Sequence, residues 1–289
     1  MINALKPVLP VLMVIFLAAC SFNKMIVHLS MPVVESRITA LFQEDDYEMV
    51  RASFPSNIKS LESLLVNDPQ NPKLHVYTAY AYYSYAFAFV EDQDRARASR
   101  LYYRCLQHGK QALQHYGIDD QLINGPTREL QQAIAGQHRE AAEGLFWTAL
   151  CWAKIVEINP DQVLNIFQWH KAVMMMEKVQ QLDDSLYLYG SDLFFGVYYA
   201  SRPPLLGGDY DLSEHYFEKA RRATGNKLLI VDLLQAQYLE RQRNDRQAFH
   251  QKLTAIIAAA DSGIKKYALV NTVARRKARH LLEKEQQWF

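Results

Sequence analysis

The residue with the clearest chemistry in this sequence is Cys20, which directly follows the small residues Ala18 and Ala19. Upstream of it, a single charged side chain, Lys6, precedes an apolar run over residues 8–16, which is the layout of a signal peptide. Residues 17–20 resemble a bacterial lipobox, in which small residues let the peptidase approach the backbone and the cysteine thiol accepts a diacylglyceryl group. We therefore predict that residues 1–19 are removed and that Cys20 carries a lipid.

The same segment determines how the protein meets a membrane. Its apolar run is too short to span a bilayer, which takes about 20 apolar residues, and Pro7 and Pro10 interrupt its start. Two or more acyl chains hold a protein on a membrane stably, whereas one chain does not. Ser21 stands where an aspartate would favour the inner membrane, so we expect a periplasmic protein tethered to the outer membrane through residues 20–36. The alternative is an ordinary buried segment that ends in a cysteine.

The other side chains form no catalytic or cofactor-binding pattern. The sequence contains no GxSxG motif, no glycine-rich nucleotide loop, and no HxxxH or HExxH pair among its nine histidines. Without residues 1–19, 31 basic and 31 acidic residues remain, and this balance does not favour nucleic acid as a partner. We expect a protein that is not an enzyme and that uses no metal or cofactor.

Two further cysteines, Cys105 and Cys151, lie in apolar, helical surroundings. A disulfide between them is permitted outside the cytoplasm. Free cysteines are also common as small buried side chains, and their spacing fits no metal site. We favour two unbridged, buried thiols.

Aromatic side chains crowd residues 73–90 and occupy nearly every direction around the expected helix axis. One interpretation is a core helix that is covered on all sides. The other is that one stripe of this helix, together with aromatic residues of two later helices, lines a cavity for an apolar or amphipathic ligand. The ligand-lining candidates are Tyr80, Tyr83, Phe87, Trp147 and Tyr199.

A second candidate site is the loop over residues 202–209, where two prolines end one helix and two glycines precede an aspartate that can cap the next. As a connection it needs no further explanation. As a functional loop, it would contact a partner protein or the mouth of the cavity, with Arg202 available for a carboxylate. The residues concerned are Arg202, Pro203, Pro204, Gly207, Gly208 and Asp209.

Charged clusters elsewhere have simple structural explanations. The acidic groups at residues 44–46 and 91–94 precede expected helices, where carboxylates cap the backbone and interact with the helix dipole. The basic cluster at residues 275–279 could contact lipid head groups or an acidic partner, and a solvated helix face is the simpler explanation.

The elements that position these residues are helices. Glycine and proline are sparse, at 11 and 10 of 289 residues, and the apolar pattern has helical rather than alternating period. The predicted helices cover residues 47–66, 73–90, 94–115, 128–137, 139–158, 167–182, 191–200, 212–223, 228–241, 246–261 and 273–285. We therefore predict an all-α domain over residues 37–289.

Consecutive helices have the character of degenerate tetratricopeptide hairpins, in which large residues of one helix meet small residues of the next. One pair joins Trp147 to Ala172, and another joins Gly196 to Phe217. The spacing exceeds the usual repeat of about 34 residues. Stacked antiparallel hairpins of this kind form an α-α superhelix with a concave binding face.

Four segments give the sequence a more specific resemblance. They are residues 79–91, 98–104, 145–147 and 202–209, and the last is the most distinctive. In these segments the chain resembles TatT, the lipoprotein T component that accompanies some TRAP-type solute transporters. The resemblance implies a helical periplasmic lipoprotein that associates with the transporter's solute-binding protein and forms oligomers, expected to be trimers, around a ligand-accessible cavity.

These expectations combine into one function and one alternative. The function is that of a membrane-tethered accessory that binds the extracytoplasmic solute receptor of a TRAP-type transporter and shelters a small hydrophobic ligand. The alternative is an envelope lipoprotein scaffold that recruits assembly factors and holds no ligand.

Overall fold

The computed structural model describes residues 8–159 and 165–289, with side-chain detail for residues 23–159, 168–205 and 207–289. Throughout these residues the regular structure is helical and contains no strand, which confirms the predicted all-α class. The α-helices are α1 (Val8–Gln43), α2 (Tyr47–Asn67), α3 (Pro72–Tyr85), α4 (Arg95–Gln114), α5 (Asp120–Asn124), α6 (Thr127–Ala135), α7 (Ala142–Ile158), α8 (Asn165–Leu182), α9 (Leu186–Ala200), α10 (Tyr210–Ala223), α11 (Ile230–Leu234), α12 (Arg246–Ala258), α13 (Ala268–Glu283) and α14 (Glu285–Trp288).

Short polar side chains begin several of these helices, as their positions in the sequence predicted. The Asp46 carboxylate accepts hydrogen bonds from the backbone N–H groups of Glu48 and Met49 at the start of α2. Asp94 caps α4 in the same way, through the N–H of Arg97. These side chains satisfy donors that have no partner inside the helix, which fixes where each helix starts.

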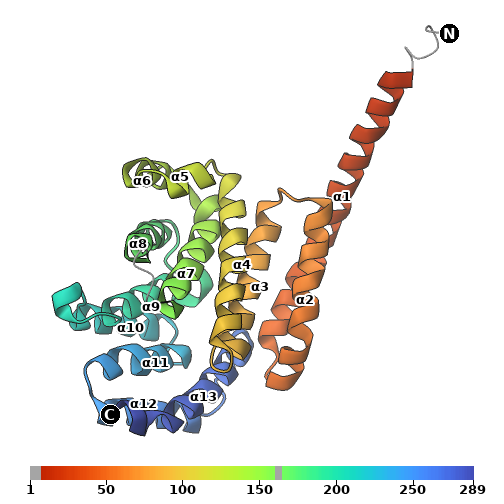
Figure 1. Cartoon of the computed structure of the whole chain (residues 1–289). Coiled ribbons are helices and arrows are strands. Elements are labelled where there is room, and N and C mark those ends of the chain that lie inside the picture. Colours follow the sequence, from red (N-terminus) through yellow and green to blue (C-terminus); the bar gives the residue numbers. More distant parts are fainter. Residues whose placement is uncertain (1–7, 160–164) are drawn as a thin grey trace.

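The helices form a curved array. Helices α2, α3, α4, α7 and α8 pack one against the next, and the pairs α9–α10 and α12–α13 continue the series. The two hairpins expected from residue size are present as the packed pairs α7–α8 and α9–α10. At its far end the chain turns back, and α13 packs against both α1 and α2 (Figure 1). The array thus closes around a central space. Its likeness to tetratricopeptide repeats remains a prediction.

Two π-helical turns interrupt the predicted α-helices. The segment predicted as one helix over residues 73–90 ends in a π-helical turn, η1 (Ala86–Val90). A second π-helical segment, η4 (Gln235–Glu240), follows α11. Three further short 3-10 segments are η2 (Arg139–Ala141), η3 (Pro204–Leu206) and η5 (Lys265–Tyr267). Ala86, Phe89 and Val90 of η1 are buried, as expected for an aromatic helix that is covered by its neighbours.

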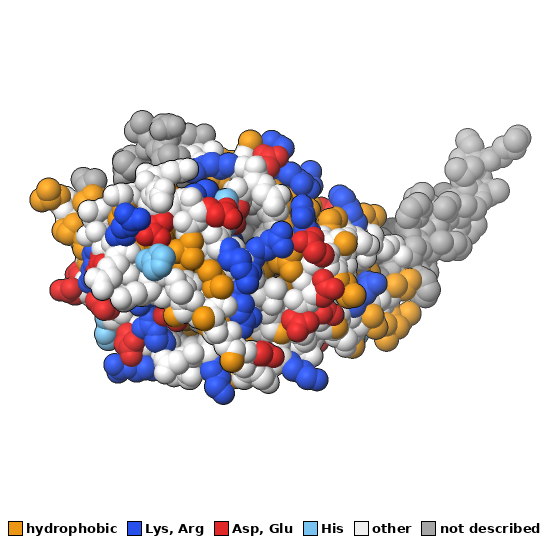
Figure 2. Space-filling view, turned by 90° about the horizontal axis from the view of Figure 1, so that it is seen from below, with side chains coloured by type: hydrophobic (Ala, Val, Ile, Leu, Met, Phe, Trp, Pro, Cys, Tyr) orange, Lys and Arg blue, Asp and Glu red, His pale blue; other side chains and the backbone are white. Residues whose placement is uncertain are grey.

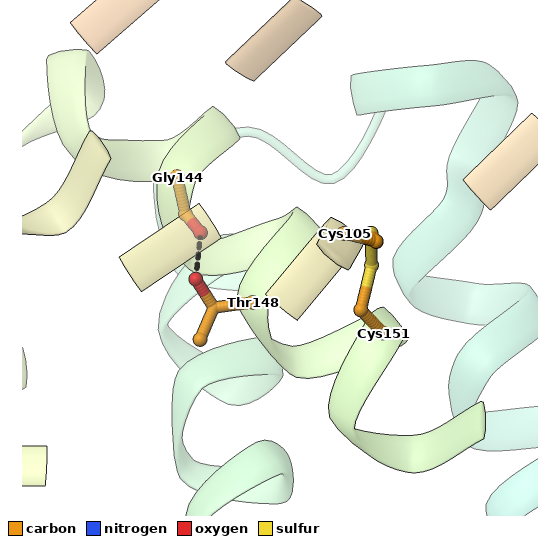
Figure 3. The surroundings of a disulfide bond; sticks show 4 residues. All are labelled: Cys105, Gly144, Thr148 and Cys151. Carbon is orange, nitrogen blue, oxygen red and sulfur yellow. Dashed lines mark hydrogen bonds between the residues drawn. A yellow bond between two sulfur atoms is a disulfide. The ribbon is translucent and has the colours of Figure 1, made fainter. Parts of the chain in front are cut away.

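The interpretation of Cys105 and Cys151 as unbridged thiols is wrong, because the two residues form a disulfide between α4 and α7 (Figure 3). Their Cα atoms are 5.9 Å apart. The two helices approach closely at Gly109, where an added Cβ would lie 2.6 Å from Oγ1 of Thr148. The Thr148 hydroxyl donates to the Gly144 carbonyl at 2.7 Å instead of facing outward. This crossing brings the cysteines together, and local sequence patterns do not reveal it.

Candidate functional site

A cavity of about 620 Å³ occupies the centre of the array, within the size range of ligand sites. Helices α1, α3, α7, α9, α11 and α13 all contribute side chains to its wall. The wall is predominantly apolar and includes Ile38, Phe42, Phe54, Leu150, Phe194, Leu234, Leu269 and Val273. A molecule that fits this wall would be largely apolar, because any unpaired polar group placed there loses its hydration without compensation.

Four of the five predicted ligand-lining residues meet at this cavity. Tyr80, Tyr83, Phe87 and Trp147 all line it. The Tyr80 ring stacks on Trp147 with centroids 4.7 Å apart, and Tyr83 lies 5.5 Å from Trp147 and 6.0 Å from Phe87. They form one continuous aromatic surface from α3, η1 and α7.

The fifth candidate, Tyr199, lies outside this group. It stacks on Tyr216 with centroids 5.9 Å apart, in a cluster with Phe195 and Tyr198, and it does not contribute to the cavity wall. Its position on α9 faces α10 rather than the central space.

Both interpretations of the aromatic segment apply, each to a different side of it. Tyr82, Tyr85 and Phe89 are buried in the core between α2 and α4, whereas Tyr80, Tyr83 and Phe87 face the cavity. This aromatic helix therefore packs against neighbouring helices on one side and faces the cavity on the other.

The hydroxyl groups of Tyr80 and Tyr83 are available to a ligand. Among the described residues, neither hydroxyl has a hydrogen-bond partner. Burial raises the pKa of Tyr80 and of Tyr83 above the ordinary value, and the nearby Lys154 offsets only part of this for Tyr83. Both groups therefore stay neutral and can donate or accept one hydrogen bond each inside an otherwise apolar space.

The cavity also includes residues that the sequence did not point to. The first turn of α9 has a left-handed backbone at Tyr187, Leu188 and Tyr189, with φ of 49°, 62° and 61°. This conformation costs roughly 1–2 kcal/mol for each non-glycine residue, and such strain tends to occur at functional sites. It places Tyr187 against Trp147, with ring centroids 4.7 Å apart, and its hydroxyl donates to Glu143 at 3.2 Å. No sequence signal predicts a left-handed tyrosine.

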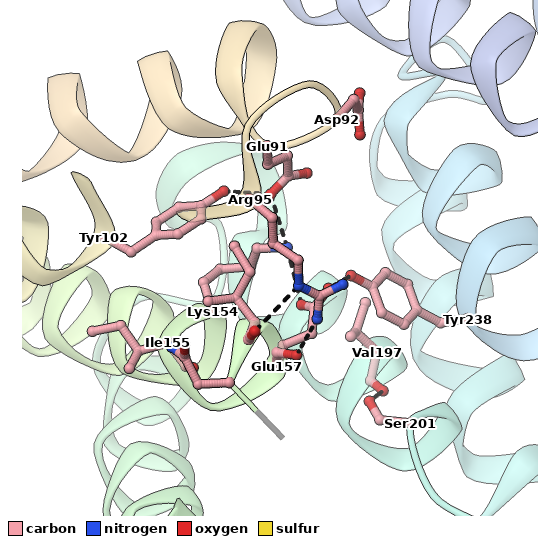
Figure 4. A network of polar contacts seen from close by, with 12 residues as sticks. Glu91, Asp92, Arg95, Tyr102, Lys154, Ile155, Glu157, Val197, Ser201 and Tyr238 are labelled. Carbon is pink, nitrogen blue, oxygen red and sulfur yellow. Dashed lines mark hydrogen bonds and ion pairs between the residues drawn. The ribbon is translucent and has the colours of Figure 1, made fainter. Parts of the chain in front are cut away.

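One end of the cavity wall is a network of paired charges (Figure 4). The Lys154 ammonium lies 3.1 Å from Glu91 and 3.0 Å from Glu157. The Tyr238 hydroxyl donates to Glu157 at 2.7 Å, and the Tyr102 hydroxyl donates to Glu91 at 2.5 Å. The sequence could have indicated this network, because Lys154 stands in the apolar run of α7 and a buried lysine needs a partner of opposite charge.

Lys277 completes the network from α13, with its ammonium 2.8 Å from Glu91 and 2.8 Å from Asp92. It is buried, so the expectation of a solvated basic face at residues 275–279 is wrong at this position. The interpretation of residues 91–94 as helix caps likewise fails at Glu91, which is a buried partner of two lysines. These ion pairs form because α13 packs against the first helices of the array and brings Lys277 to Glu91 and Asp92. Local sequence patterns do not reveal this long-range contact.

The pairing of charges within the network favours the charged forms of Glu91 and Lys154. Burial alone would raise the pKa of Glu91, but Lys154, Lys277 and the Tyr102 hydrogen bond outweigh it and lower this pKa to about 2. Burial alone would lower the pKa of Lys154, but Glu157 and Glu91 outweigh it and raise this pKa above its ordinary value. Because the charges compensate one another, the network closes the cavity without offering an unpaired charge to a ligand.

The loop over residues 202–209 is sharply shaped but lies away from the cavity. Gly207 has φ of 84°, and a Cβ at Gly208 would collide with the Arg202 carbonyl oxygen, so both positions require glycine. Asp209 caps α10 by accepting from the Leu212 N–H at 2.9 Å, as predicted. None of the predicted loop residues, Arg202, Pro203, Pro204, Gly207, Gly208 and Asp209, lines the cavity.

The loop offers a different feature, which is an exposed apolar tip. Leu205 is 98% exposed, and the Arg202 guanidinium below it stacks on Tyr198 at 4.0 Å from the ring centre. A rigid backbone that holds an apolar side chain in water has the character of a contact site for another protein.

The remaining predicted features concern metals and the membrane. The described residues contain no group of three or more His, Cys, Asp or Glu side chains that could hold a metal ion. Residues 1–7 of the expected signal peptide lie outside the described residues, and the Cys20 side chain is likewise not described. Within the described part, Asn23–Gln43 is long and apolar enough to cross a membrane by length and composition. In its apolar 18-residue window, 11% is buried in the body.

Comparison with known proteins gives two findings. A family model described as "TRAP transporter T-component" matches residues 43–289, which is most of the chain. The matched range includes the whole cavity wall except Ile38, Thr39 and Phe42 of α1. The chain is also similar to an uncharacterized protein of Treponema pallidum (strain Nichols). The two are 24% identical over 266 residues, which cover 86% of this chain and 81% of the relative.

Proposed function

The chain belongs to the TRAP transporter T-component family, and we propose that it is a membrane-tethered periplasmic accessory that binds the solute receptor of a TRAP-type transporter and holds a small hydrophobic ligand. Family membership supports the accessory role in transport. The proposal includes a lipid on Cys20, attachment to the outer membrane and assembly into an oligomer, expected to be a trimer. It assigns the protein no catalytic step and no cofactor.

The observation that carries the ligand half of the proposal is the aromatic cavity. Its wall brings together Tyr80, Tyr83, Phe87 and Trp147 over a volume of about 620 Å³. A space of this size lined by apolar groups is costly to leave unfilled, because the lining atoms lose packing contacts. The hydroxyl groups of Tyr80 and Tyr83 in this wall can orient a ligand by one or two hydrogen bonds.

The test is to fill the cavity. Ala88 lines it, and replacing this residue by tryptophan would occupy space that the ligand needs. We expect protein purified from its own membranes in mild detergent to carry an apolar small molecule, detected by mass spectrometry of an organic extract. The Ala88→Trp protein should lose most of this molecule.

A matched control separates ligand loss from damage to the fold. Ala52 on α2 is exposed, and the Ala52→Trp protein should retain the molecule in full. Ser84→Leu provides a milder filling change in the same wall should Ala88→Trp unfold the protein. If the wild-type protein carries no such molecule, or if all variants carry it equally, the scaffold function without a ligand becomes the better description.

A further inference from the structure

Helix α1 carries a stripe of apolar side chains that the body of the protein does not cover. Met25, Ile26, Leu29 and Val33 are 51%, 40%, 68% and 60% exposed. Because each residue turns an α-helix by about 100°, these four side chains fall within an arc of about 100° around the axis. Figure 2 shows hydrophobic side chains gathered at the right-hand edge of the described body. We call these four residues the outer stripe.

The outer stripe is distinct from the face by which α1 packs on the body. Val27 and Val34 are buried, and with Met31 and Ile38 they pack against a cluster that includes Leu61 of α2 and Leu74 of α3. On the helix these packing residues lie roughly opposite the outer stripe. The helix is therefore apolar on two sides, and folding of the chain explains only one of them.

The position of the outer stripe indicates what covers it. It begins five residues after Cys20, and α1 is one continuous helix from Val8 to Gln43 rather than a loose connection. At about 1.5 Å per residue, Val33 lies about 20 Å along the helix from Cys20. If lipid chains on Cys20 enter a bilayer, as the proposed function holds, the whole outer stripe lies within about 20 Å of that bilayer.

We infer that α1 lies along the membrane surface, with the outer stripe inserted at the boundary between head groups and acyl chains. An amphipathic helix binds a membrane in this way through its apolar face. Arg37, which is exposed at the edge of the same side, suits contact with phosphate groups. This inference rests on the lipid anchor of the proposed function but does not depend on the receptor or the ligand.

The orientation matters for the cavity, because α1 belongs to both sites. The last turns of α1 place Ile38, Thr39 and Phe42 in the cavity wall, and the Phe42 ring stacks on Tyr80 with centroids 4.7 Å apart. A helix held flat on the membrane would thus fix the body, and the cavity with it, at one orientation to the lipid surface.

The experiment places an environment-sensitive NBD fluorophore on the helix. With Cys20 lipidated, as proposed, and Cys105 bridged to Cys151, a cysteine introduced by Leu29→Cys is the one free thiol. The labelled protein is reconstituted into vesicles, with and without brominated phospholipids. We expect a blue-shifted emission that brominated lipids quench and that does not change with the ratio of protein to lipid.

His28→Cys is the matched control, because His28 is exposed, adjacent in sequence and turned about 100° away from Leu29. Its label should emit as in water and resist quenching. Equal, water-like emission from both positions would overturn the inference. A shift at residue 29 that grows with the protein-to-lipid ratio and escapes bromine quenching would also overturn it, because a second copy of the chain would then cover the stripe. The mass of the purified protein shows separately whether Cys20 carries a lipid, which distinguishes failure of this inference from failure of the lipid anchor in the proposed function.

Discussion

At the scale of single residues, Glu91 shows how a buried charge becomes part of the fold. Its carboxylate lies between the ammonium groups of Lys154 and Lys277, which come from helices far apart in the sequence. A buried ion pair adds little over an apolar pair, but removal of one partner leaves the others uncompensated at a cost of about 3–5 kcal/mol. Glu91 therefore joins α7 and α13 to the end of η1.

This arrangement predicts a specific dependence of stability on pH. The pKa of Glu91 is about 2 in the folded protein, below its ordinary value, so the carboxylate stabilises the fold. This stabilisation is complete above pH about 4.5 and is lost as the pH falls through that value toward 2. We expect this contribution to be about 3 kcal/mol, to be measured by urea unfolding at a series of pH values.

Comparison of two variants isolates this contribution from that of other carboxylates. Glu91→Gln should be less stable than the wild type at pH 7 and should lose less stability on acidification. Glu129, which is exposed on α6, provides the control, and Glu129→Gln should follow the wild-type curve. Parallel curves for Glu91→Gln and the wild type would show that this pairing does not stabilise the fold.

The sequence predicted individual residues best where their surroundings are local. Tyr80, Tyr83 and Phe87 share a helical face, so their meeting at one wall follows from helix geometry. Tyr199 was predicted to line the cavity but packs on Tyr216 of α10, because the direction in which this side of α9 faces depends on how α10 packs. Partners such as Tyr238 and Lys277 are brought in by the path of the whole chain, which residue types do not encode locally.

At the scale of elements, the Cys105–Cys151 disulfide ties α4 to α7 and closes a loop with a sequence separation of 46 residues. Reduction should lower the free energy of unfolding by about 2–4 kcal/mol, because the reduced chain gains conformational freedom when it unfolds. The measurement is urea unfolding with and without reductant, where the reduced protein should also show a steeper transition.

The double variant Cys105→Ala with Cys151→Ala provides the control for this measurement. It should unfold at the lower urea concentration of the reduced protein and should not respond to reductant. An oxidised protein whose transition is unaffected by reductant would contradict a stabilising role for the bond.

Most helices could be predicted from the sequence, because apolar period and capping side chains are local properties. Predicted and observed bounds of the helices from α2 to α4 differ by only a few residues, apart from the π-helical turn. Helix α1, which covers the expected tether, was missed. The short α5 and α14 were also missed, since one turn of helix carries too little periodic pattern. The left-handed turn at Tyr187 was missed because tertiary packing, rather than local preference, maintains it.

At the scale of the whole molecule, the proposed receptor contact can be tested at the loop between α9 and α10. Leu205 is 98% exposed at the loop tip, and Leu205→Glu changes this surface without touching the glycines that shape the backbone. We expect at least a tenfold loss of affinity for the solute receptor, since a hot-spot side chain contributes about 2 kcal/mol or more. Surface plasmon resonance with the purified receptor gives the affinity.

Val66 supplies the matched control, because it is also an exposed apolar residue, at 82%, but lies at the end of α2. Val66→Glu should bind the receptor like the wild type. Unchanged binding by Leu205→Glu would make the loop a connection only and would direct the search for the receptor contact to another surface.

The disulfide between α4 and α7 would also affect export of the chain to the proposed periplasmic location. Thiols stay reduced in the cytosol, and disulfides form in oxidising compartments such as the periplasm. A chain that is exported would therefore lack its covalent link while it waits for the translocation channel and acquire it only after crossing. Reduced stability before export favours the unfolded form that a channel can thread, and oxidation afterwards makes the folding that follows harder to reverse.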